Sequence, residues 1–203
     1  MEFTANHITL LGELNTLPAF SHENHGKRFY RFLLDVPRLS GAVDTLPIIA
    51  EESRICDLDP CAGSRVQVTG QIRTHNRRWD NARHLLIFVF AESVSILDGE
   101  PKNECVLEGL LCKDPVYRRT PLGREICDLM LAVPRAFHRA DYIPCILWGR
   151  NALEVSGCHT RDRIRIEGRF QSRSYTKLTE AGAEERTAYE ISAMSVEILE
   201  YHL

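Results

Sequence analysis

The sequence of 203 residues has no apolar run approaching 18 residues, so it predicts no membrane-spanning helix. Residues 1–6 include neither a positively charged segment nor an apolar one, and no secretory signal is expected. With 44% hydrophobic and 26% charged residues, the composition is that of a globular protein that can bury a core. These features favour a cytoplasmic protein of one or two domains.

Cysteines are not arranged as disulfide or zinc ligands. The seven cysteines are odd in number and no C-x-x-C occurs, which argues against a disulfide framework and a zinc ribbon. Four of them lie in strand-like segments, where a cysteine is usually a small buried hydrophobe: Cys105, Cys112, Cys127 and Cys145. We therefore expect free thiols.

Motifs of known enzymes are missing as well. The sequence contains no G-x-S-x-G, no Walker loop, no H-E-x-x-H and no recognisable pair of catalytic acids. His22 and His25 with Glu23 resemble metal ligands only superficially, because no third ligand lies nearby, and solvated loop residues are the simpler interpretation. We expect no metal, no cofactor and no enzymatic activity.

The charge is nearly balanced overall but uneven along the chain. The net charge is -3, with 10 basic and 13 acidic residues in 1–100 and 15 of each in 101–203. Of the 25 basic residues 21 are arginines, the type suited to bidentate phosphate contacts and to stacking on bases.

An internal repeat divides the chain in two. A shift of 97 residues aligns 6–47 with 103–144 without a gap, and 12 of these 42 positions are identical. A shift of 98 brings 65–70 onto 163–168, and a shift of 102 brings 93–97 onto 195–199. The repeat predicts two copies of one domain, residues 1–99 and 100–203.

Each copy reads as five short strands with one short helix between the third and the fourth. In the second copy we expect strands at 104–113, 125–133, 142–148, 162–175 and 187–199, and a helix at 151–156. This order predicts two tandem all-β five-stranded barrels, and mid-strand glycines suit the bends of a small closed barrel. Periodicity alone does not separate the OB topology from other five-stranded barrels.

The second copy interleaves basic residues with aromatic ones. Alternation along the fourth strand and its turn places Arg163, Arg165 and Arg169 on one face, followed by Arg173 and Lys177, and Arg118, Arg119 and Arg124 cluster in a predicted loop between strands one and two. Tyr142 and Trp148 point away from the predicted interior, and Phe137 and Tyr175 lie in or beside loops. Aromatic faces stack on unpaired bases while arginines neutralise phosphates. An outward aromatic that packs under a loop and a solvated arginine row are the alternatives.

The second copy resembles the bacterial single-stranded DNA-binding protein family. The resemblance rests on Leu107-Glu108-Gly109, on the stretch from Asp141 to Ala152, and on the stretch from Arg163 to Tyr175. The resemblance covers about 103–199 well and 6–97 more weakly. The whole sequence is similar to the tandem-barrel members of the family from anaerobic Gram-positive bacteria. It implies the OB fold for both copies.

The resemblance also implies a function and its residues. The family stacks bases on aromatics that fall here on Phe137, Tyr142, Trp148 and Tyr175, and the basic residues expected beside them include Arg135 and Arg150. The expected function is sequence-independent binding and protection of single-stranded DNA in replication, recombination or repair, at the nucleoid. An RNA-binding module stays open, because stacking platforms accept both nucleic acids.

The first copy departs from this pattern. Ser40, Thr45, Glu51 and Arg77 stand at the four aromatic positions, and the hairpin after strand four carries Arg73, Arg77, Arg78 and Trp79. This predicts a weaker DNA contact or a structural half. The alternative function is therefore an adaptor of a replication or mobile-element complex, similar to primosomal replication protein N.

Two expectations concern partners. The family's usual assembly places four barrels around DNA, so two barrels per chain imply a homodimer. Family members usually end in a flexible tail whose acidic tip recruits repair enzymes, whereas this sequence ends at Leu203 just after the last predicted strand. We do not expect acidic-tip recruitment.

Overall fold

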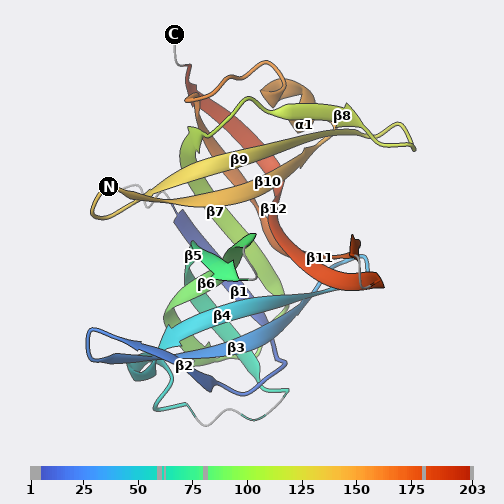
Figure 1. The fold of residues 1–203 in the computed structure, drawn as a ribbon. Helices are drawn as coiled ribbons and strands as arrows, with labels where there is room; N and C mark the ends of the chain where they lie inside the picture. The colour runs from blue at the N-terminus through green and yellow to red at the C-terminus, as the bar shows by residue number, and fades with distance from the viewer. Residues whose placement is uncertain (1–5, 59–60, 62, 80–81, 180–181, 202–203) are drawn as a thin grey trace.

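The computed structural model describes residues 6–58, 61, 63–79, 82–179 and 182–201, and the side chains of 78, 79, 82, 83, 178 and 179 lie outside the description. It is almost entirely β-structure. In Figure 1 the two halves of the chain form two barrels that meet at their first strands, β1 and β7.

The two halves contain corresponding strands in the same order, with a 3-10 helix in the first half where the second has an α-helix. The first half consists of β1 (Asn6–Leu14), β2 (Ala19–Asn24), β3 (Lys27–Pro37), β4 (Val43–Glu51), the 3-10 helix η1 (Glu52–Arg54), β5 (Arg65–Trp79) and β6 (Ala82–Ile96). The second consists of β7 (Lys102–Leu111), β8 (Val116–Arg119), β9 (Glu125–Arg135), β10 (Arg139–Trp148), α1 (Arg150–Val155), β11 (Arg163–Thr179) and β12 (Gly182–Glu200).

All these strands join in one continuous sheet whose order is symmetric about its centre. The order is β2-β3-β4-β6-β5-β1-β7-β11-β12-β10-β9-β8, and the pairings β1–β3 and β7–β9 close each half into a barrel. This arrangement confirms the all-β OB fold.

A local two-fold relation connects the halves at β1 and β7. In this antiparallel pair Ile8 lies opposite Cys105, which is its own counterpart in the repeat, and Asn6 lies opposite Leu107. A strand that pairs with its own repeat in this way has the geometry of an isologous dimer interface. The chain is thus built like a symmetric dimer joined into one polypeptide.

Two buried carboxylates fasten the halves together, one on each side of this axis. Asp44 of the first half accepts a hydrogen bond from the Ser172 backbone N–H at 2.7 Å. Its repeat counterpart Asp141 accepts one from the Thr74 backbone N–H at 2.7 Å. Because both carboxylates are almost inaccessible to solvent, they fix the β5 and β11 strands against the opposite barrel.

Each barrel encloses a core of alternating side chains. In the second half Ile143, Cys145 and Leu147 of β10 are buried, as the alternation predicted. The mid-strand glycines permit close strand crossings, since a Cβ at Gly12 or Gly109 would collide with a carbonyl oxygen of the crossing strand. The glycines thus act where strands cross closely, and their expected role in strand bends stays a prediction.

The structure differs from the expectations in local detail. Each half has one more strand than predicted, β2 and β8, because these short segments are mostly exposed and show no apolar alternation. The first half has a single 3-10 turn where the second has α1. Cys112 lies just past β7 and is half-buried rather than buried in a strand. The domain boundary at 99/100 stays a prediction.

Candidate nucleic-acid interface

The outward face of β10 carries two of the predicted aromatics. Tyr142 and Trp148 alternate with the buried side chains of this strand and are 46% and 40% exposed. Trp148 lies opposite Ile126 of β9, and Tyr142 lies opposite Ala132. Both rings are therefore held by a rigid strand with a large part of their surface open to solvent.

Trp148 belongs to a groove between the two halves, which we call the Trp148 groove. One wall comes from β8, β9 and β10, another from β11 and β12, and Arg38 reaches in from the first half. Its lining residues are Arg38, Arg118, Thr120, Ile126, Asp128, Ile146, Trp148, Gln171, Ser172, Arg173 and Glu190. The groove thus combines an exposed indole with three guanidinium groups.

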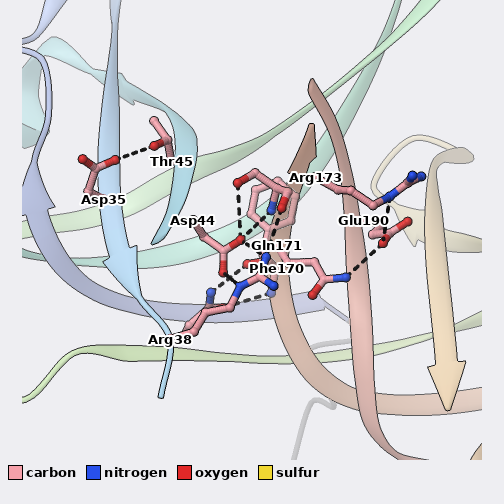
Figure 2. A network of polar contacts seen from close by, with 10 residues as sticks. Asp35, Arg38, Asp44, Thr45, Phe170, Gln171, Arg173 and Glu190 are labelled. Atoms are coloured by element: carbon pink, nitrogen blue, oxygen red, sulfur yellow. Dashed lines mark hydrogen bonds and ion pairs between the residues drawn. The ribbon is translucent and has the colours of Figure 1, made fainter. Parts of the chain in front are cut away.

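Carboxylates neighbour the arginines of the groove. Arg118 Nε donates to Asp128 Oδ2 at 2.7 Å, and Arg173 Nε lies 3.8 Å from Glu190 Oε1. Gln171 Nε2 also donates to Glu190 at 2.9 Å (Figure 2). The hydrogen bond to Asp128 raises the pKa of Arg118 above its ordinary value, so this side chain stays charged.

Arg38 is fixed by the inter-barrel contact. Its Nε donates to Asp44 Oδ2 at 2.7 Å, and its Nη2 donates to the Ser172 carbonyl at 3.0 Å (Figure 2). The hydrogen bond to Asp44 raises the pKa of Arg38. The first half therefore contributes a positioned cation beside the aromatic face of the second.

Phe137 and Tyr142 line a second hollow at the other end of β10, the Phe137 hollow, together with Leu110, Ala132, Pro134, Arg135, His138, Arg139 and Ala140. Phe137 is 90% exposed, in the turn between β9 and β10. Phe137 and His138 have φ of 60° and 54°, a conformation that costs non-glycine residues roughly 1–2 kcal/mol each. The corresponding turn of the first half has Gly41 at the position of His138.

The remaining predicted aromatic lies on the β11–β12 hairpin. Tyr175 is part of β11, as expected, although this strand continues beyond it to Thr179, and its side chain is 39% exposed. The Arg173 guanidinium lies 6.0 Å from the centroid of its ring. Lys177 follows on the same strand and is exposed. In Figure 1 this hairpin extends from the second barrel toward the ends of β3 and β4.

The arginine row of the fourth predicted strand is divided. Arg163 and Arg165 lie where β11 pairs with β7, and Arg163 is ion-paired with Glu108. The pairing with β7 ends at Gly168, and Arg169 beyond it is half-buried. Arg163, Arg165 and Arg169 line neither of the two hollows. The structure does not gather the row around the aromatics.

Other predicted basic residues are dispersed. The expected loop between strands one and two is in part the strand β8, which contains Arg118 and Arg119, whereas Arg124 lies in the turn that follows. Arg119 is ion-paired with Glu125, away from Asp128 and the groove, and Arg150 is exposed at the first position of α1.

The predicted basic residues of the first half lie on β5. Arg73 is ion-paired with the buried Asp141 at 3.1 Å, so this side chain helps to fasten the barrels. Arg77 is exposed farther along the strand. The side chains of Arg78 and Trp79 lie outside the described residues.

Sequence reasoning missed several groove residues. Arg38, Asp128 and Glu190 were not predicted to belong to the site. The identity of Val36-Pro37-Arg38 with Val133-Pro134-Arg135 was a signal for Arg38, since a repeated arginine beside a repeated aspartate indicates a shared contact. Nothing in the sequence indicated that Asp128 and Glu190 would face the arginines.

The described residues contain neither a candidate metal cluster nor a helix suited to crossing a membrane. No group of three or more His, Cys, Asp or Glu side chains in the described part of the chain could hold a metal ion. Within the same residues, no helix is long and apolar enough to cross a membrane.

Comparison with known proteins identifies the family. Residues 102–199 match the model of the single-strand binding protein family. The chain is 36% identical over 80 residues to single-stranded DNA-binding protein B of Bacillus subtilis, a match that covers 36% of this chain and 71% of that protein. The chain belongs to the single-strand binding protein family.

Other relatives of the family are matched over less of their length. The single-stranded DNA-binding protein 1 of Staphylococcus aureus is 39% identical over 80 residues, which are 36% of this chain and 48% of that protein. The Bacillus cereus protein is 35% identical over 107 residues, covering 48% of this chain and 60% of that protein. This chain therefore spans only about half of the length of these relatives.

A solved structure matches the whole chain. The single-stranded DNA binding protein from Thermus aquaticus superimposes with a TM-score of 0.78 at 21% identity, over 98% of this chain and 94% of that one. This likeness establishes the fold over both halves.

Proposed function

We propose that the protein binds and protects single-stranded DNA without regard to sequence, in replication, recombination or repair. The observation that carries the proposal is the Trp148 groove, where an exposed indole lies beside Arg38, Arg118 and Arg173. A base stacks on the ring while guanidinium groups neutralise its phosphates. Family membership supports a binding protein rather than an enzyme.

In this proposal the single-stranded DNA runs over the outward face of β10. Phe137 and Tyr142 at one end and Trp148 at the other offer stacking surfaces on one strand and its turn, and Tyr175 extends the series on the hairpin. Arg135 and Arg173 lie next to these rings, and the more distant arginines of β11 act in long-range attraction of the polyanion.

Two chains associate in this proposal, so that four barrels surround the DNA at the nucleoid of the cytoplasm. The support is arithmetic, because one chain supplies two barrels and the family's usual assembly has four. Light scattering on the full-length protein should then give twice the 23.2 kDa of one chain, and a mass of one chain would contradict it.

A titration tests the binding function. Oligo-dT, duplex DNA and RNA oligonucleotides are titrated into the protein at several salt concentrations. We expect tight binding to oligo-dT, weak binding to duplex, and a log–log salt slope of about -0.7 for each phosphate neutralised. Absence of any oligo-dT binding at low salt would refute the proposal, and stronger binding of RNA would redirect it to RNA.

A further inference from the structure

We infer that the first barrel has a base-stacking site of its own, in which the rings come from different strands than in the second barrel. The inference rests on the proposed function and extends it to the half that lacks all four expected aromatics. Its ligand is the unpaired bases of single-stranded nucleic acid.

In the first half the aromatic residue lies on the strand next to the one that carries it in the second half. In the second half Trp148 of β10 lies opposite Ile126 of β9. The equivalent pair in the first half is Glu51 of β4 opposite Phe29 of β3. The aromatic and the non-aromatic residue have therefore exchanged strands. Phe29 lies on the outward face, as Trp148 does, but it is only 7% exposed because neighbouring rings cover it.

Further rings gather on the same face. Phe88 and Phe90 of β6 alternate with the buried Ile87, Val89 and Ala91, so they point away from the core. Phe90 lies 5.9 Å from Phe29 between ring centroids. The exposed imidazole of His22 covers Phe29, with the rings 4.9 Å apart and 12° from parallel. His22 stacks on Phe29 in the way that a base would. An incoming base then stacks on the outer face of His22.

The two carboxylates of the Trp148 groove have no counterpart on this face. The repeat places Arg31 where the second half has Asp128. Strand pairing gives the second equivalence: Phe88 lies opposite Arg73, just as Glu190 lies opposite Gln171 in the second half. Both carboxylates that neighbour arginines in the second half are thus replaced. Glu51 remains, ion-paired with Lys27 at 2.9 Å.

The test uses the full chain with the second site weakened by Tyr142→Ala and Trp148→Ala. Residual affinity for a dT oligonucleotide is measured at low salt after adding Arg31→Ala or Phe88→Leu. The matched controls are Arg28→Ala and Phe20→Ala. Arg28 also lies exposed on β3, but its guanidinium packs on Phe20 and Tyr30, on the opposite face of the strand.

We expect Arg31→Ala to lower the magnitude of the salt slope by about 0.7 and Phe88→Leu to weaken binding about fivefold or more, with both controls unchanged. Equal effects of Arg31→Ala and Arg28→Ala, or no residual binding in the weakened background, would overturn the inference. Because Arg31 is exposed, we expect the Arg31→Ala variant to keep the barrel folded. Failure of wild-type protein to bind oligo-dT would instead refute the proposed function.

Discussion

The Nε atom of Arg118 donates a hydrogen bond to Oδ2 of Asp128 at 2.7 Å, inside the groove that also contains Trp148. A phosphate that binds Arg118 therefore has to compete with a carboxylate already in place. In the proposed site this cation is charge-paired in the free protein, and we expect the pairing to lower the net affinity for DNA.

Removing that carboxylate should strengthen DNA binding. For Asp128→Asn we expect about a two- to fivefold higher affinity for oligo-dT, the range of an exposed ion pair. The matched control is Glu125→Gln, which removes the same charge from the Arg119 pair outside the groove. Fluorescence polarisation at fixed salt measures both variants, and equal affinities would show that Asp128 does not compete.

The buried carboxylate Asp141 should contribute strongly to stability. Its side chain is fully buried and contacts Arg73, Arg135 and the Thr74 backbone. Asp141→Ala leaves those donors without their acceptor, so we expect a loss of about 2–4 kcal/mol in the free energy of unfolding. Urea denaturation checks this, with the exposed Glu154→Ala as the control. A loss below that of the control would contradict the fastening role.

The turn that contains Phe137 and His138 gives one prediction for stability and one for DNA binding. His138→Gly relieves a left-handed backbone conformation at the position where the first half has Gly41, and should raise stability by up to about 1 kcal/mol after the entropic cost of glycine. Phe137→Ala should weaken oligo-dT binding without changing stability, since its ring is almost wholly exposed. Thermal melts and titrations separate the two effects. A destabilised His138→Gly would show that the turn is unstrained.

Thiol reactivity should divide the cysteines into two groups. Burial raises the pKa of Cys105 to about 12, that of Cys127 to about 11 and that of Cys145 well above its ordinary value. At pH 8 these groups are almost entirely protonated, and the thiol is far less reactive than the thiolate. Exposed Cys56 and Cys61 should react rapidly with Ellman's reagent, and the buried thiols only after denaturation. Fast reaction of Cys105 in the native protein would contradict its burial.

The repeat made the fold predictable, because each half supplied an independent copy of the same strands and bends. What escaped prediction depended on pairing between distant segments. The short strand β8 has no apolar alternation, so Arg118 was expected in a loop. Asp44 and Asp141 are identical in the repeat, but their burial between the barrels arises only from tertiary packing. The ring of Phe29 was overlooked because position-by-position comparison cannot detect an aromatic that has moved to a neighbouring strand.

The most direct test of the proposed DNA site is the affinity of Trp148→Ala for oligo-dT relative to wild type, measured by polarisation of a labelled oligonucleotide. Loss of one stacking ring should cost roughly 1–3 kcal/mol, a five- to about 150-fold rise in Kd, independent of base sequence. The fold should be unchanged, because the indole projects outward from β10. An unchanged Kd in a folded variant would contradict binding at the Trp148 groove.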